Sequence, residues 1–97
     1  MEESSGKDVA AVLTAAAFED TIRRLSTKYG IADHEKVADI LEELKKQGVL
    51  QGPQVGIAQS YLSFRNKALH AKWGEVDLSA IESALAFTEQ LLLKHFS

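Results

Sequence analysis

The fold class follows from the stretch FEDTIRRLSTKYG, residues 18–30. Its apolar residues are spaced four, three and four positions apart, which places them on one face of an α-helix. They are Phe18, Ile22, Leu25 and Tyr29. Gly30 follows directly, and glycine adopts at little cost the left-handed conformation that commonly ends a helix. This stretch therefore predicts an amphipathic helix that ends at Tyr29.

Upstream of this stretch, the same helix is expected to begin near Asp8. Residues 9–17 are apolar on nearly every side, so we expect this half of the helix to be buried on more than one face. Residues 1–7 are acidic and polar, and we expect them to form a disordered tail. The folded domain is therefore predicted to occupy residues 8–97.

Three further helices are predicted from apolar periodicity and from residues typical of helix ends. They cover residues 33–47, 53–72 and 77–95. Asp33 is a suitable N-cap for the first of them, and Pro53 suits the first turn of the second. Asp77 or Ser79 opens the third, where Ser79 and Glu82 have the spacing of a capping box.

The predicted inner faces of these helices carry mostly apolar residues. They are Val37, Ile40, Leu41, Leu44, Val55, Ala58, Tyr61, Leu62, Ala68, Leu69, Ile81, Ala84, Leu85, Thr88, Leu91 and Leu92, with Phe87 at the flank. No strand-like alternation of useful length occurs, and short connections favour antiparallel neighbours. We therefore expect an all-α fold, an antiparallel up-down four-helix bundle.

Composition excludes several classes of function. The chain has no cysteine, so disulfides, thiolate zinc sites and cysteine nucleophiles are excluded, and no cluster of histidine and carboxylate has metal-ligand spacing. No apolar run is long enough to span a membrane, and the first residues do not resemble a secretory signal. We expect a cytoplasmic protein without metal or cofactor. The net charge of −3 argues against sequence-independent binding to a nucleic-acid backbone but leaves a local basic patch open.

The stretch SFRNKALHAKW, residues 63–73, is the one candidate for chemistry. Asn66 and His70 are four residues apart and share one helix face. Arg65 stands near the apolar stripe of its helix, where an arginine is costly unless it is paired or at an interface. His34 and His95 lie at a helix start and at the chain end, and we interpret both as exposed surface residues.

Periodicity alone leaves two interpretations of Arg65 and His70. In the first, Arg65 pairs with Glu19 or Glu82 at a helix crossing, and His70 caps a helix end. In the second, the two side chains form a functional site.

The segment RNKALH, residues 65–70, resembles the R-x4-6-H signature of the HEPN superfamily (higher eukaryotes and prokaryotes nucleotide-binding domains). The stretches 16–25, 60–66 and 91–96 are similar to a bacterial HEPN-like group whose domains often close a longer protein linked to phage defence. The resemblance covers about residues 9–96. The chain departs from the superfamily in its short length and its acidic net charge.

The resemblance implies a metal-independent endoribonuclease that acts as a homodimer, with two motifs at a shared cleft. His70 would be the general base or acid, Arg65 would hold the scissile phosphate, and Asn66 would orient His70 or the phosphate. The expected product is a 2′,3′-cyclic phosphate, so DNA would not be cut. Lys67 and Lys72 would either touch RNA phosphates or lie solvated on the helix face.

Four other residues have two interpretations each. Glu19 would pair with Arg23, four residues on, or would reach Arg65 or His70 in a HEPN-like packing. Tyr61, Phe64 and Trp73 are either core residues or part of a dimer interface.

The sequence thus leaves three functions. The first is a ribonuclease domain of a toxin or phage-defence system, with an antitoxin or other domains of a longer chain as partners. The second is a non-catalytic helical dimerisation or interaction module of a larger defence or restriction protein. The third is nucleotide binding at the same cleft.

Overall fold

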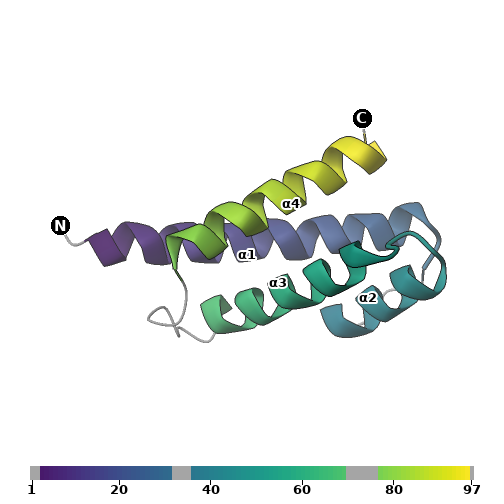
Figure 1. The fold of residues 1–97 in the computed structure, drawn as a ribbon, viewed down its shortest axis with the longest axis horizontal. Coiled ribbons are helices and arrows are strands. Elements are labelled where there is room, and N and C mark those ends of the chain that lie inside the picture. Colours follow the sequence, from purple (N-terminus) through teal and green to yellow (C-terminus); the bar gives the residue numbers. More distant parts are fainter. Residues whose placement is uncertain (1–2, 32–35, 70–76, 97) are drawn as a thin grey trace.

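The computed structural model of the chain describes residues 3–31, 36–69 and 77–96. These ranges contain four α-helices and no strand (Figure 1). The helices are α1 (Glu3–Lys28), α2 (Val37–Lys46), α3 (Pro53–Leu69) and α4 (Leu78–Phe96). The all-α class and the four-helix bundle expected from the sequence are confirmed. None of the helices in these ranges is long and apolar enough to cross a membrane.

The helix starts differ in part from those predicted. Residues 3–7, which we expected to form a disordered tail, belong to α1. Once the alanine-rich segment downstream has formed a helix, each added turn costs little, so the helix extends backwards. Asp33 lies outside the described residues, but its prediction as the N-cap of α2 was wrong, because Lys36 holds that position with an extended backbone and the helix begins at Val37. At α4, Asp77 is the cap, because the Ala80 backbone N–H donates to Asp77 Oδ1 at 2.7 Å.

The ends of α1 and α2 follow the predicted glycine signals. Gly30 and Gly48 have φ angles of 71° and 76°, in the left-handed region. The N–H of Ile31 donates to the Ser26 carbonyl at 2.9 Å, and the N–H of Val49 donates to the Leu44 carbonyl at 2.9 Å. Each is the long hydrogen bond of a Schellman motif, which satisfies a carbonyl that the helix end would leave unpaired.

The four helices are present, but their directions depart from the alternating up-down order that the sequence analysis expected (Figure 1). Ala11 and Ala15 of α1 pack with Ala84 of α4, and at the opposite end Lys28 Nζ donates to the His95 carbonyl. The helices α1 and α4 therefore run in the same direction, whereas α3 runs antiparallel to both of them (Figure 1). A strictly alternating order would have set the first and last helices antiparallel.

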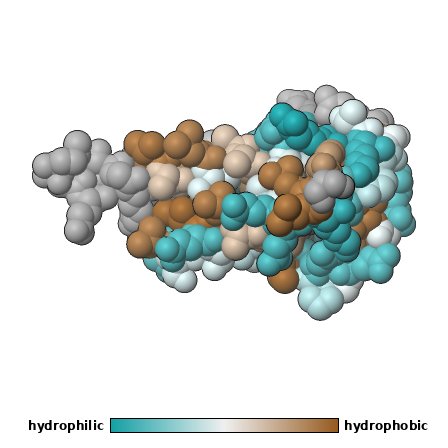
Figure 2. Space-filling view, turned by 90° about the horizontal axis from the view of Figure 1, so that it is seen from above, coloured by the Kyte–Doolittle hydropathy of each residue, from teal (hydrophilic) through white to brown (hydrophobic). Residues whose placement is uncertain are grey.

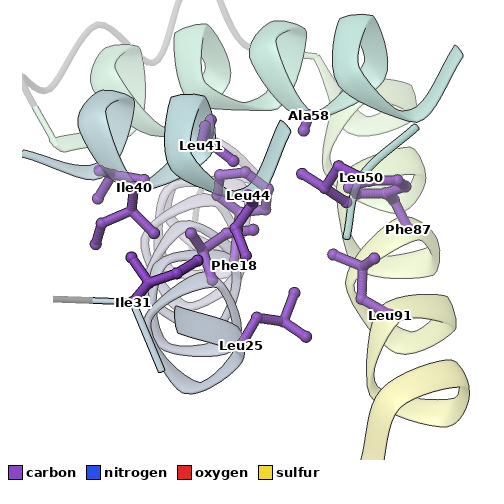
Figure 3. Packing of buried hydrophobic residues seen from close by; sticks show 12 residues of the cluster. Phe18, Leu25, Ile31, Ile40, Leu41, Leu44, Leu50, Ala58, Phe87 and Leu91 are labelled. Carbon is purple, nitrogen blue, oxygen red and sulfur yellow. The ribbon is translucent and has the colours of Figure 1, made fainter. Parts of the chain in front are cut away.

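The core consists of two clusters with different side chains. The larger cluster draws on all four helices and includes Ile22 of α1. Figure 3 shows other large side chains of this cluster, among them Phe18 and Leu25 of α1. The smaller cluster joins α1, α3 and α4 only and is rich in alanine. It consists of Ala11, Ala15, Phe64, Ala68, Ile81 and Ala84. Tyr61 packs against both clusters and so connects them.

Several residues that the sequence placed in the core are exposed. On α1, Val9 and Leu13 are 59% and 65% exposed, because α2 packs beside the other half of the helix and leaves this outer face uncovered. On α4, Leu85 and Leu92 are also exposed, whereas Phe87 is buried. The buried face of α4 is therefore turned from the predicted one toward Phe87. Apolar surface is visible over the half of the molecule that contains the start of α1 (Figure 2).

Two leucines on α1 test how the helix is buried. Leu25 is fully buried in the larger cluster, so Leu25→Ala should lower the free energy of unfolding by about 2–5 kcal/mol. Leu13→Ala makes the same deletion at an exposed position and should cost no more than about 0.5 kcal/mol. Urea unfolding followed by circular dichroism measures both. Equal losses for the two variants would contradict the burial described for α1.

Candidate functional site

Arg65 lies where α3 crosses α1 and is held by three hydrogen bonds. Its Nε and Nη2 donate to Glu19 Oε1 at 3.0 Å and 2.7 Å, and its Nη1 donates to Asn66 Oδ1 at 2.8 Å. Both charged side chains are about one-quarter exposed. The cost of placing an arginine near the apolar stripe is therefore offset by Glu19 of α1, one of the two partners that the sequence suggested.

Glu19 also binds a second arginine. Arg23, four residues further along α1, donates from Nε to Glu19 Oε2 at 3.0 Å. The sequence presented the pair with Arg23 and the contact with Arg65 as alternatives, and the structure contains both. One carboxylate thus holds two guanidinium groups, one from its own helix and one from α3.

The environment of Glu19 stabilises its charged form. Partial burial alone would raise the pKa of this carboxyl. The hydrogen bonds from Arg65 and Arg23, together with their positive charges, outweigh that effect and lower the pKa of Glu19 below its ordinary value. Glu19 is therefore ionised at neutral pH and keeps Arg65 in a fixed orientation.

A pocket of about 330 Å³ opens beside Arg65. Arg65, Asn66 and Leu62 of α3 line one side of it, and the start of α2 lines the other. The residues from that second side are Lys36, Val37 and Ala38. The lining carries two positive charges and no acidic residue. Because the N-terminus of a helix also has partial positive charge, the pocket is suited to an anion such as a phosphate group.

Sequence reasoning missed the part of this pocket that α2 supplies. Lys36 stands at the N-cap position of α2 and forms no side-chain cap there. Serine, threonine or aspartate is the preferred residue at an N-cap, so a lysine there is unusual. This lysine could have pointed to the site, because it places a cation beside a helix N-terminus. The start of α2 lies next to Arg65 because of tertiary packing. The sequence pattern does not predict this packing.

Several of the other residues considered in the sequence analysis lie outside the part of the chain that the structure describes. His70, Lys72 and Trp73 lie outside the described residues, as does His34. Lys67 is on α3 but does not line the pocket. The described part of the chain therefore brings together Arg65, Asn66 and Glu19 of the predicted site.

Two aromatic residues near the motif belong to the core. Phe64 is 6% exposed and packs in the smaller cluster. Tyr61 lies between Phe18 and Phe87, with ring centroids 6.4 Å and 5.3 Å away. The alternative that Phe64 lies at a dimer interface is therefore wrong, because the bundle itself covers this side chain.

His95 is buried, so its interpretation as an exposed residue was wrong. It is 8% exposed, and its Nδ1 lies 2.8 Å from the Tyr29 hydroxyl. Its position four residues after the buried Leu91 continues the inner face of α4 to the last turn. Burial, and then the positive charges of Lys94 and Lys28, lower the pKa of His95.

Comparisons with known proteins place no further constraint on the site. No family model matches the chain, and no curated protein and no solved structure matches it significantly. Within residues 3–31, 36–69 and 77–96, no three histidine or carboxylate side chains are grouped so that they could hold a metal ion.

The contact between Glu19 and Arg65 can be measured with a double-mutant cycle of Glu19→Gln and Arg65→Gln. We expect a coupling energy of about 1–2 kcal/mol at neutral pH, since the pair is partly buried and makes charge-assisted hydrogen bonds. The exposed pair of Asp20 and Arg24 is the control and should couple by about 0.3–0.5 kcal/mol.

The same coupling should depend on pH. Because the pKa of Glu19 is lowered in the folded state, its stabilisation is complete above the ordinary pKa of a glutamate, about 4.3. It should be lost as the pH falls through the lower folded-state pKa, where Glu19 takes up a proton. A coupling unchanged down to pH 2, or no larger than that of the control pair, would contradict the assignment.

His95 should make stability depend on pH in a second range. The folded protein resists protonation of this group, while the unfolded chain takes up the proton below about pH 6.5. The free energy of unfolding should therefore decrease as the pH falls from about 6.5 to the lower folded-state pKa. His95→Gln should remove that part of the decrease in urea unfolding at pH 7.5 and 5.5. An identical pH dependence in both proteins would show that His95 is accessible to protonation.

Proposed function

We propose that the chain is a metal-independent endoribonuclease domain of the HEPN type, in which Arg65, Asn66 and His70 act on RNA at a cleft formed by two copies. One observation carries the proposal. Arg65 and Asn66 of the R-x4-6-H segment line a pocket whose remaining polar contribution is a lysine at a helix N-terminus. That combination recognises phosphate.

Glu19 supports this function by orienting Arg65. It accepts hydrogen bonds from Nε and Nη2, which fixes the plane of the guanidinium. A guanidinium has five N–H groups, and three of them form the hydrogen bonds to Glu19 and Asn66 that the described residues contain. The remaining donors on Nη1 and Nη2 would bind the scissile phosphate and stabilise the negative charge that develops on it.

The reaction would be a transfer within the RNA strand. The 2′-oxygen attacks the neighbouring phosphorus, the bond from phosphorus to the 5′-oxygen breaks, and the products are a 2′,3′-cyclic phosphate and a 5′-hydroxyl end. His70 would accept the proton of the 2′-hydroxyl or donate one to the departing 5′-oxygen. Its place in this scheme rests on the sequence motif. Two motifs would face one another across a two-fold axis in a homodimer.

A non-catalytic interaction module is the second candidate, and the exposed apolar side chains favour it. On α1 and α4, Val9, Leu13, Leu78 and Leu85 are each between 44% and 65% exposed. Apolar surface of this kind commonly marks a protein contact. In that function Arg65 would only hold α3 to α1, and the protein would associate without cleaving RNA.

Cleavage of a labelled single-stranded RNA in the presence of EDTA separates the two candidates. Wild-type protein should produce fragments that end in a 2′,3′-cyclic phosphate, and an all-deoxy strand should stay intact. Arg65→Gln and His70→Ala should each lower the rate at least about a hundredfold, the scale of losing a transition-state donor or a general base. Lys45→Gln, a charge change on the exposed side of α2, should keep the wild-type rate.

Glu19→Gln tests whether Arg65 affects cleavage only by stabilising the fold. The glutamine retains a hydrogen-bond acceptor but removes the charge, so Arg65 should stay in place and the rate should change only a few-fold. If Arg65→Gln and Glu19→Gln slow cleavage equally and are equally destabilised, Arg65 acts through the fold. Absence of cleavage by the wild-type protein, or wild-type rates in Arg65→Gln and His70→Ala, would overturn the proposal.

A further inference from the structure

A second pocket, of about 390 Å³, lies beside the C-terminal end of α1 and has a different chemistry. Arg23, Arg24, Thr27 and Lys28 line it from α1, and Phe96 lines it from the last turn of α4. Three of these five residues are cationic, and none is acidic. Phe96 is 43% exposed, so its side chain is only partly covered by the bundle.

The cations stand in a fixed arrangement on the helix. Arg24 and Lys28 are four residues apart, one helical turn and about 6 Å along the axis. Lys28 Nζ donates to the His95 carbonyl and lies 5.1 Å from the centroid of the Phe96 ring. Lys28 thereby fixes the end of α4 against α1 and holds the aromatic ring beside the cations.

Two acidic groups of the described residues, Asp20 and Glu19, pair with the arginines that line this pocket. Asp20 accepts a hydrogen bond from Arg24 at 2.7 Å, but both side chains are more than 60% exposed, so this pair is weak and open to competition. Glu19 binds Arg23 and also Arg65, and its single charge is shared between two guanidinium groups. Arg23 and Arg24 line this pocket, and Arg65 lines the other one. Every arginine of the chain therefore lines a pocket, although the net charge of the chain is −3.

We propose that this pocket is a second contact site for single-stranded RNA, in which Arg24 and Lys28 bind the phosphate backbone and a base stacks on Phe96. Cations that follow the backbone beside an exposed aromatic ring are the arrangement by which proteins hold single strands without reading their sequence. The assignment of RNA as the ligand rests on the proposed function. Arg23 of this pocket and Arg65 of the first pocket both form an ion pair with Glu19. The carboxylate of Glu19 therefore connects the two pockets.

The site would also explain how an acidic chain binds RNA. The negative charge is carried in part by α2 and α4, where Glu42, Glu82 and Glu89 are exposed. None of these residues lines either pocket.

Binding of a 2′-O-methyl RNA oligonucleotide, which lacks the reactive hydroxyl, tests the site without cleavage. Fluorescence anisotropy gives the Kd for the wild-type protein and for Arg24→Gln and Phe96→Leu. Arg24→Gln removes only an exposed ion pair from the fold, and Phe96→Leu keeps apolar bulk but loses the ring face. Each should weaken binding about fivefold or more, the scale of losing a stacking contact or a phosphate contact. Lys45→Gln, with the same loss of charge outside both pockets, should bind like the wild type.

The salt dependence supplies a second readout. Loss of one phosphate contact should reduce the slope of log Kd against log salt concentration by about 0.7 for a single strand, in Arg24→Gln but not in Phe96→Leu. Wild-type affinity in both variants, equal weakening in Lys45→Gln, or no binding by the wild-type protein would overturn the second site.

The outcomes also separate this site from the proposed function. If the protein cleaves RNA and the two variants bind normally, the ribonuclease assignment stands and the second site fails. If the variants weaken binding but the wild-type protein cleaves nothing, the RNA-binding site stands and the ribonuclease assignment fails.

Discussion

The structure depends on one helix that provides the packing surface for the three others. The helices α2, α3 and α4 all pack against α1, and the large side chains of its second half fill the main core. Such a helix cannot carry charge on its inner face without a partner. Glu19 stands at the edge of that face, and the arginine that it binds belongs to α3. The ion pair of Glu19 with Arg65 therefore has two consequences. It holds α3 against α1 where the two helices cross, and it orients the Arg65 guanidinium beside a pocket.

Arg65 shows why a structural and a functional interpretation need not exclude one another. Glu19 engages the guanidinium through Nε and Nη2, while Asn66 accepts from Nη1. An arginine held in this way has already lost most of its side-chain freedom, so binding an anion would cost little additional entropy. The same hydrogen bonds that stabilise the crossing would thus make the side chain a better phosphate ligand.

Much of the fold could be predicted from the sequence because its signals are local. The stops at Gly30 and Gly48 depend on the conformation of single residues, and the four helices follow from apolar spacing. Which face of each helix is buried, in contrast, depends on tertiary packing and not on a local signal in the sequence. Phe87 is buried and Leu85 is exposed because α4 packs on α1 from one side, and the periodicity of α4 fits either choice.

The candidate site was predictable only in part, for the same reason. Arg65 and Asn66 were found from a short motif and from the cost of an arginine near an apolar stripe. Lys36 was not, since its contribution arises where α2 begins against α3. His95 was misjudged because a residue near a chain end is usually solvated, whereas α4 continues its buried face to the last turn.

The division of the core into two clusters has a consequence for how the molecule opens. Alanine buries far less apolar surface than phenylalanine, isoleucine or leucine, so the end that holds Ala11, Ala15 and Ala84 is secured by a smaller hydrophobic free energy. Amide protons on the first half of α1 should therefore exchange with solvent through partial openings, while those around Ile22 exchange only when the whole domain unfolds. The protein is in this sense a stable half joined to a looser one.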